Sequence, residues 1–404
     1  MKAVILAAGN STRLAPFSDS RPKSMILISG ELILERVLKQ VREAGISEVC
    51  VVVGPKGEQI EEAFHFGKAL GLKLSYQRQE AATGIGQALS LAQGFVGQDP
   101  EFLLLFGDCL ASGNNVTHLL QQAQGRPRQN LAMITHPHLE GAYGNIYLGH
   151  DMKIQRLVEK PLVGERHSNY ILGGSFLLQT PVFQTLAALH LDMVALYQDL
   201  ISKGELEASL WEDEWIDISR PWHILDANRM IMSTWQQSII PASAEIDPGV
   251  HLQGPVHLGE KVRISAGATL VGPCYIGDNC FIGHSTLIRD HSSIGPGSVI
   301  GYGTEVKNSV LFGHSTVGRL SYIGDSVIGE AAHLGSGAMT VNTNYCDQVF
   351  NLSLPEGEVN TGRTKLGAFL GDRCIIGAGH ILKPGTLVAP GSVWPDHFTN
   401  PPAT

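Results

Sequence analysis

Eleven aliphatic residues at a constant spacing of six organise the second half of this 404-residue chain. They are Ile246, Leu252, Leu258, Ile264, Leu270, Ile276, Ile282, Ile288, Ile294, Ile300 and Val306. From Leu252 on, a smaller residue stands two positions before each one, and these are Val250, Val256, Val262, Ala268, Cys274, Cys280, Thr286, Ser292, Ser298 and Thr304. An α-helix, with its period of 3.6, does not repeat in this way. Six residues make one flat side of a three-sided coil, so the spacing predicts stacked coils with the aliphatic residue inside.

Such coils bury a continuous core along their axis, as solenoids do. The pattern resembles the hexapeptide repeat of the left-handed parallel β-helix. Three cysteines, Cys274, Cys280 and Cys374, fall on the small inward positions. We therefore predict that these thiols are buried and unreactive.

The period breaks near 307–323 and again across 342–364. It resumes at Leu370, Ile376, Leu382 and Val388. An insertion in a solenoid usually forms a loop on one face, where it either lines a site or decorates the surface.

Residues 1–235 follow a different pattern, in which strand-like and helix-like segments alternate. The strand-like runs are KAVILAA (2–8), EVCVVVG (48–54) and FLLLFGD (102–108). The helix-like runs are ILERVLKQVREAG (33–45), which ends at the stop signal Gly45, and GEQIEEAFHFGKALG (57–71). This alternation predicts a mostly parallel sheet with helices on both faces, and a ligand site beyond the carboxyl ends of its strands.

Composition excludes several classes of protein. A net charge of −9, from 38 acidic and 29 basic residues, argues against a nucleic-acid partner. No apolar run reaches the roughly 18 residues that a membrane span needs. The six cysteines form no CxxC pair, and Met1 leads directly into a strand-like run, so we expect a cytoplasmic protein.

The segment after the first strand, LAAGNSTRLAPFSDSRPKSM (6–25), is suited to phosphates. Gly9 allows close backbone approach, and Arg13 and Lys23 add positive charge. Neither GxxxxGK[ST] nor GxGxxG is present, so this is not a Walker loop or a dinucleotide fingerprint.

This segment closely resembles LAAGxGTRLxPxTxxxPKxM, the signature of sugar-1-phosphate nucleotidylyltransferases. Further segments resemble the family's motifs in the same order: QEAATGIGQAL (79–89), LLLFGDCL (103–110), AYGNIYL (142–148), VEKP (158–161), YILGGSFLL (170–178) and WIDISRPWHILDAN (215–228). The resemblance implies an α/β, Rossmann-like nucleotidyltransferase domain over 1–235. The left-handed parallel β-helix, an acyltransferase-like hexapeptide-repeat domain, would then occupy 236–404.

The resemblance also implies a reaction and its residues. A nucleoside triphosphate and a sugar 1-phosphate give a nucleotide sugar and pyrophosphate, with Mg²⁺ on Asp108 and Asp217. Catalytic roles fall to Arg13, Lys23 and Asp108. Nucleotide contacts fall to Leu6, Ala8, Gly9, Ser11, Thr12, Gln79, Gly84 and Ile85, and sugar-phosphate contacts to Gly144, Glu159, Lys160 and Gly174. The apolar Ile85 favours UTP or dTTP, and Ser11 replaces a family glycine.

In bifunctional relatives the β-helix is an acetyltransferase that uses acetyl-CoA. Arg289, Lys307, Tyr322 and Asn342 fall on matching positions of a possible second site. The family's HLxYxGD motif supplies a histidine base, whereas this chain reads RLSYIGD with Arg319 in its place. An arginine cannot accept a proton near neutrality.

His333 likewise replaces an expected asparagine, and either His314 or His333 could serve as the base. We favour a β-helix that makes a homotrimer without acetylating. Three alternatives stay open: a bifunctional enzyme, a regulatory subunit that senses nucleotide sugars, and a cytidylyltransferase acting on a non-sugar phosphate.

Overall fold

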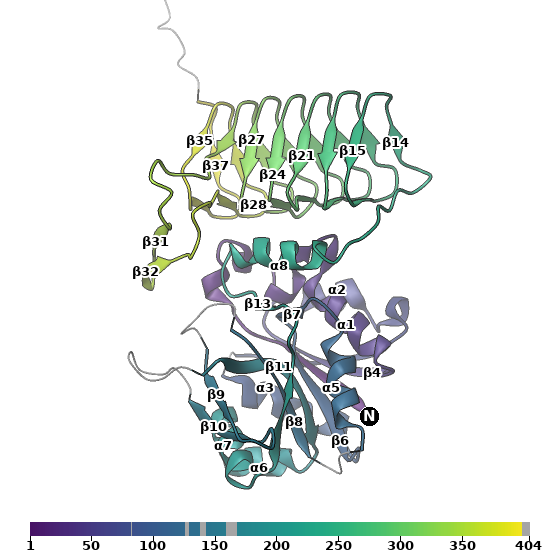
Figure 1. Ribbon diagram of the computed structural model, residues 1–404, viewed down its shortest axis with the longest axis vertical. Helices are drawn as coiled ribbons and strands as arrows, with labels where there is room; N and C mark the ends of the chain where they lie inside the picture. Colours follow the sequence, from purple (N-terminus) through teal and green to yellow (C-terminus); the bar gives the residue numbers. More distant parts are fainter. Residues whose placement is uncertain (82, 126–128, 138–142, 159–167, 398–404) are drawn as a thin grey trace, which may run out of the picture. The chain divides into compact units, whose positions relative to one another are not determined.

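A computed structural model describes residues 1–81, 83–125, 129–137, 143–158 and 168–397. Its packing divides the chain into two compact units (Figure 1). The first unit comprises Met1–Asn10, Pro22–Met25 and Ile33–Asp217. The second comprises Ser11–Arg21, Ile26–Leu32 and the chain from Ile218 onward. The domain limits 1–235 and 236–404 stay a prediction, and each packing unit is described by itself.

A nine-stranded mixed sheet forms the centre of the first unit. Its main path runs β10-β9-β11-β6-β1-β4-β5, and β8 joins β11 to β12. The strands are β1 (Lys2–Ala7), β4 (Glu48–Val53), β5 (Lys73–Arg78), β6 (Glu101–Phe106), β8 (Asn130–Thr135), β9 (Asn145–Leu148), β10 (Ile154–Val158), β11 (Tyr170–Gln179) and β12 (Leu206–Leu210).

The predicted predominance of parallel pairing holds for only part of this sheet. The strands β6, β1, β4 and β5 are parallel, and so are β8 and β12. The long strand β11 runs antiparallel to β6, β8 and β9, and β9 runs antiparallel to β10. The sheet is therefore mixed, because the ten-residue strand β11 runs antiparallel to its neighbours and one further pair, β9 with β10, is antiparallel.

Helices cover both faces of the sheet, as predicted. One apolar layer packs the sheet against α3 (Ile85–Leu91), α4 (Gln93–Val96), α6 (Val182–Ala188) and α7 (Met193–Ser202). The opposite layer packs it against α1 (Ile33–Glu43), α2 (Glu58–Phe64) and α5 (Asn115–Ala123). The predicted helix over 57–71 is shorter than expected, because His65 and Gly67 adopt φ values of 45° and 77° and end α2.

Three parallel sheets build the second unit, as expected for a left-handed parallel β-helix (Figure 1). One consists of β14 (Glu245–Ile246), β17 (Arg263–Ile264), β20 (Phe281–Ile282), β23 (Val299–Ile300), β26 (Thr316–Val317), β29 (His333–Leu334), β34 (Ile375–Ile376) and β37 (Val393–Trp394). The next consists of β15 (His251–Gln253), β18 (Thr269–Val271), β21 (Leu287–Arg289), β24 (Glu305–Lys307), β27 (Tyr322–Gly324), β30 (Met339–Thr340) and β35 (Ile381–Leu382). The last consists of β16 (Val256–Leu258), β19 (Cys274–Ile276), β22 (Ser293–Ile294), β25 (Val310–Leu311), β28 (Val327–Ile328), β33 (Phe369–Leu370) and β36 (Leu387–Val388).

The six-residue spacing places its aliphatic residues in one buried core, from Leu258 to Val388. Only the first two, Ile246 and Leu252, are partly exposed at 37% and 36%, because they belong to the terminal coil. Cys274, Cys280 and Cys374 are buried in this core, as predicted. Burial raises the pKa of Cys274 to about 12 and that of Cys280 to about 11.

The two breaks in the period have different structural causes. Phe281 pairs with Val299, 18 positions later, but Ser293 pairs with Val310 and Val310 with Val327, each 17 positions later. The break over 307–323 is therefore not a loop. Two corners of the β-helix, at Asn308 and Asp325, are each one residue shorter than usual, so the six-residue spacing shifts while the coils continue. The break over 342–364 is a true insertion, with a hairpin of β31 (Asn351–Leu354) and β32 (Gly357–Asn360).

The remaining strands are short, and the remaining α-helix is largely buried. They are β2 (Leu27–Ile28), β3 (Glu31–Leu32), β7 (Cys109–Ala111), β13 (Trp215–Asp217) and α8 (His223–Met232). In the described part of the chain, no helix is long and apolar enough to cross a membrane.

Candidate active site

Two carboxylates meet at the carboxyl end of the parallel strands in the first unit. β6 lies beside β1 and ends at Phe106, so Asp108 follows two residues later. β13 pairs antiparallel with β7, which places Asp217 opposite Cys109. This small two-stranded ribbon brings together two carboxylates that lie more than one hundred residues apart in the sequence.

Lys23 completes this group, which we call the carboxylate cluster: Lys23, Asp108, Cys109 and Asp217. The Lys23 Nζ donates to Asp108 Oδ2 at 2.9 Å and to Asp217 Oδ1 at 2.6 Å. The Lys23 side chain is only 8% exposed. Burial alone lowers its pKa, but the two carboxylates overcome that effect and hold the pKa above its usual value, so Lys23 stays protonated.

The carboxylate cluster suits a divalent cation. Carboxylate oxygens of Asp108 and Asp217 and the Cys109 sulfur lie within 4.8 Å of one another. Burial raises the pKa of the Cys109 thiol well above its usual value, so the thiol is neutral. Two carboxylates and one ammonium therefore leave one net negative charge. Mg²⁺ prefers oxygen ligands, so Asp108 and Asp217 fit it while Cys109 does not.

The predicted nucleotide residues fall in both packing units. Leu6, Ala8 and Gly9 lie at the end of β1 in the first unit, and Ser11, Thr12 and Arg13 belong to the second. Ser11 adopts the left-handed conformation with φ of 48° just before the helical turn Thr12–Leu14, and Arg13 is exposed.

The predicted base-reading residues lie together at the start of α3. Gln79 is buried, and its Nε2 donates to the Gly84 carbonyl at 3.1 Å. Gly84 precedes α3 with φ of 120°, and Ile85 is 46% exposed. The exposed Ile85 side chain can therefore contact a ligand, whereas the Gln79 side-chain amide already donates to the Gly84 carbonyl.

The predicted sugar-phosphate residues are only partly described. Gly174 lies in β11 with φ of 78°, and a Cβ there would come within 3.0 Å of the Cys109 sulfur. Gly144 lies just before β9 and is half-buried. Glu159 and Lys160 lie outside the described residues.

Sequence reasoning missed two contributors to the first unit's site. The sequence predicted no role for Cys109, yet it belongs to the carboxylate cluster. Trp215 was not singled out, but its Nε1 donates to the Gly173 carbonyl at 3.0 Å and so ties β13 to β11. The available signals were that Cys109 directly follows Asp108 and that Trp215 lies two residues before Asp217.

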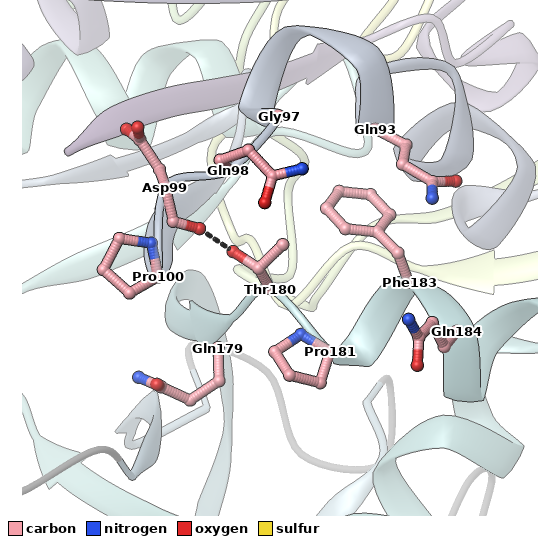
Figure 2. Close-up of a pocket in the computed structure, with 10 residues that line it drawn as sticks. All are labelled: Gln93, Gly97, Gln98, Asp99, Pro100, Gln179, Thr180, Pro181, Phe183 and Gln184. Atoms are coloured by element: carbon pink, nitrogen blue, oxygen red, sulfur yellow. Dashed lines mark hydrogen bonds between the residues drawn. The ribbon is translucent and has the colours of Figure 1, made fainter.

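A separate cleft of about 460 Å³ lies where β6 begins and β11 ends (Figure 2). Four glutamines and Asp99 line it, and the Thr180 hydroxyl donates to the Asp99 carbonyl (Figure 2). Its ten lining residues include no cationic side chain, so this cleft does not suit phosphate-bearing substrates.

The possible second site is a buried polar group on adjacent coils of the second unit. Asp325 is 3% exposed and accepts hydrogen bonds from Lys307 at 3.2 Å, Asn308 at 2.5 Å and Asn342 at 2.5 Å. Arg289 on β21 and Tyr322 on β27 lie on either side of β24, the strand that carries Lys307.

The candidate bases His314 and His333 are exposed, and so is Arg319. His314 lies at the corner between β25 and β26, and Arg319 at the corner between β26 and β27. His333 lies on β29, in a different sheet from Tyr322.

Comparisons with known proteins agree with both halves of the chain. The family described as Nucleotidyl transferase matches residues 2–234, and the GMPPB C-terminal domain matches residues 270–397. The "Bifunctional protein GlmU" of Methanococcus maripaludis (strain C7) is 38% identical over 97% of this chain and 93% of its own length. The "Bifunctional sugar-1-phosphate nucleotidylyltransferase/acetyltransferase" of Sulfurisphaera tokodaii is 27% identical over 99% of this chain and 97% of its own length.

A solved structure supports the fold of the first half. The putative glucose-1-phosphate thymidylyltransferase of Bacillus anthracis has a TM-score of 0.53 at 21% identity, over 57% of this chain and 95% of its own. The fold and the carboxylate cluster define a nucleotidyl transferase that carries a β-helix. Within that class, the chain belongs to the sugar-1-phosphate nucleotidylyltransferase family.

Proposed function

We propose that this protein transfers a nucleotidyl group from UTP or dTTP to a sugar 1-phosphate in a Mg²⁺-dependent reaction in the cytoplasm. The carboxylate cluster carries the proposal, because it combines a buried cation with two carboxylates at the strand ends where such folds bind ligands. The six free cysteines are consistent with a reducing compartment.

The proposed reaction is an in-line displacement at phosphorus. An oxygen of the sugar phosphate attacks the α-phosphorus, and the bond from that phosphorus to the bridging oxygen of pyrophosphate breaks. Both reactants are anions, so catalysis consists mainly of alignment and charge neutralisation. Mg²⁺, held by Asp108 and Asp217, would neutralise phosphate charge.

We assign the remaining roles as follows. Lys23 holds the two carboxylates in position and adds positive charge near the phosphates. Arg13 contacts the α-phosphate and the leaving pyrophosphate. Gln79, Gly84 and Ile85 contact the base, with Leu6, Ala8, Gly9, Ser11 and Thr12 along the nucleotide, and Gly144, Glu159, Lys160 and Gly174 contact the sugar phosphate.

A substrate matrix tests the proposal. Purified full-length protein is mixed with Mg²⁺, each of several nucleoside triphosphates and each of several sugar 1-phosphates, and pyrophosphate is assayed. We expect release with UTP or dTTP and at least one sugar phosphate. No release with any pair would refute the proposal, and binding of a nucleotide sugar without turnover would favour a regulatory subunit.

We further propose that the β-helix makes the protein a homotrimer. Large apolar side chains are exposed along it, at Val299, Tyr302, Leu320, Met339, Ile375, Ile381 and Val393. Such residues mark interaction surfaces when they gather on one face. Light scattering measures the oligomeric state: we expect a trimer that Leu320→Asp combined with Ile381→Asp dissociates, and a monomer at micromolar concentration would contradict the proposal.

Acetyl transfer from acetyl-CoA is the second candidate activity, because two relatives are named bifunctional and the residues proposed for it lie on adjacent coils. The amine of a sugar phosphate would attack the thioester carbonyl and release coenzyme A, and a base must remove the amine proton. Arg319 cannot do so. Coenzyme A release that Tyr322→Phe or His333→Ala abolishes would establish this activity.

A further inference from the structure

Eleven residues of the phosphate-loop motif, Ser11–Arg21, pack in the second unit with the β-helix. The chain leaves the first unit after Asn10 and returns to it at Pro22. This excursion carries Arg13, and Lys23 lies two residues after its end. Its geometry therefore bears on two of the residues to which we assign catalytic roles.

One carboxylate of the β-helix, Asp372, holds the end of the excursion. Asp372 Oδ2 accepts from Arg21 Nη2 at 2.6 Å, from Arg21 Nε at 3.2 Å and from Ser20 Oγ at 2.6 Å. The side chains of Asp372 and Arg21 are 4% and 12% exposed. Arg21 Nη2 also reaches Glu330 Oε2 at 2.8 Å. A charge-assisted contact through two guanidinium nitrogens fixes direction as well as distance.

An apolar contact reinforces this anchor. Phe17 is fully buried, and its ring meets that of Phe312 edge-on at 5.1 Å. The Arg21 guanidinium lies 5.0 Å from the centroid of the same Phe312 ring. The exposed Arg13 thus projects from an excursion whose large apolar side chains, Leu14 and Phe17, are buried.

We propose that Asp372 is a positioning residue for nucleotidylyl transfer, because it fixes through Arg21 the excursion that carries Arg13 and leads into Lys23. The inference rests on the proposed function. It assigns the β-helix a part in the first reaction that does not depend on acetyl transfer. Alignment within about an ångström matters for such reactions, so loosening this anchor is expected to weaken catalysis without touching substrate.

The chain offers a matched control for Asp372. Asp372 also caps its coil, since its Oδ1 accepts from the Glu330 amide at 2.8 Å. Asp278 occupies the same kind of corner after Gly277, and its Oδ1 accepts from the Glu260 amide at 2.8 Å. Asp278 is exposed and makes no hydrogen bond or ion pair with Ser11–Arg21 in the described part of the chain. Asp278→Asn therefore changes the same kind of contact between neighbouring coils as Asp372→Asn does, but it leaves Ser11–Arg21 unaffected.

The experiment compares Asp372→Asn with Asp278→Asn in the full-length protein. We expect Asp372→Asn to lower kcat/KM for the triphosphate about tenfold, mainly through KM, and Asp278→Asn to stay within twofold of the native value. The double variant Arg21→Gln with Asp372→Asn should be no worse than Asp372→Asn, because the two residues act as one unit. Equal effects of the two Asp variants would overturn the proposal.

Hydrogen exchange keeps the inference independent of turnover and of global stability. In Asp372→Asn we expect at least tenfold faster exchange at amides of residues 12–20, with exchange in β17 and β20 unchanged. If the native protein releases no pyrophosphate, the proposed function fails while this exchange result still reports on the anchor. Unchanged exchange at 12–20 would overturn the anchor itself. If Asp372→Asn fails to fold, Ser20→Ala and Arg21→Lys replace it in both measurements.

Discussion

The β-helix core and the carboxylate cluster are assembled in opposite ways. In the regular coils, each inward residue meets the residue 18 positions away, as Ile282 meets Ile300. In the carboxylate cluster, Lys23, Asp108 and Asp217 come from three distant segments. Many similar contacts between coils stabilise the β-helix core. The proposed function of the carboxylate cluster instead depends on a few contacts that no other residues of the described chain duplicate.

The largest expected effect is on the carboxylate cluster. We expect Asp108→Asn to lower kcat about 10³-fold, or about 4 kcal/mol of barrier, because it removes a charge from both the proposed metal site and the Lys23 contact. Circular dichroism and thermal unfolding provide the folding control, and Glu214→Gln provides the activity control. Native turnover in Asp108→Asn would remove this residue from the mechanism.

A smaller effect tests the periodic core. Ile300 is fully buried, whereas Leu387, at the outward position of β36, is 39% exposed. We expect Ile300→Ala to lower the free energy of unfolding by about 3 kcal/mol and Leu387→Ala by less than about 0.5 kcal/mol. Denaturant unfolding in the full chain measures both. Equal losses would mean that the spacing of six does not separate inside from outside.

The same contrast explains which parts of the fold the sequence predicts. The inward positions and buried cysteines follow from local spacing, because each coil repeats one geometry. Shortened corners were harder to predict, because a change of register by one residue at Asn308 looks like a loop in the sequence. The antiparallel pairs were not predicted, because the sequence pattern of a strand does not show which strands it pairs with or in which direction. The strand β11 runs antiparallel to β6, β8 and β9.

The candidate site shows the same limit. The sequence pattern places Asp108 after a strand-like run, at the sheet edge where such folds bind ligands, and the family resemblance supplied Asp108, Asp217 and Lys23. The direct contact of Lys23 with both carboxylates depends on the pairing of β7 with β13, which no spacing encodes. The link between Arg21 and Asp372 spans 351 positions and was equally invisible in the sequence.

A third prediction contrasts thiols inside and outside the coils. Cys346 is exposed in the insertion, whereas Cys274, Cys280 and Cys374 are buried with pKa values raised to between about 11 and about 12. At pH 8 we expect a thiol reagent to modify Cys346 about 10²-fold faster than those three, because thiolate is the reacting form. Cys346→Ser should remove the fast phase, and rapid reaction of four thiols would contradict the burial.

These three thiols also make stability depend on pH. Their native pKa values lie above the ordinary value of 9.0, so the unfolded chain loses its thiol protons first. Their contribution to stability is present below pH 9 and is lost as the pH rises towards 12. In Cys274→Ala the slope of unfolding free energy against pH between 9 and 11 should be shallower, and an unchanged slope would exclude this thiol as a source.

The smallest effect concerns Ser11, where the family signature has glycine. Ser11 adopts φ of 48°, a conformation that glycine reaches without a steric penalty and that costs other residues roughly 1–2 kcal/mol. The glycine of the signature therefore has a conformational reason, besides close approach to phosphate. Ser11→Gly keeps that geometry and removes a hydroxyl that the proposed triphosphate could contact.

We expect Ser11→Gly to keep kcat/KM within tenfold, or about 1.4 kcal/mol, of the native value. Ser11→Val is the matched opposite, because a β-branched residue is disfavoured at positive φ and should lower kcat/KM further. A larger loss in Ser11→Gly than in Ser11→Val would show that the hydroxyl, and not the backbone conformation, is what this position contributes. The phosphate loop would then differ in chemistry, and not only in sequence, from the glycine-bearing loops of its family.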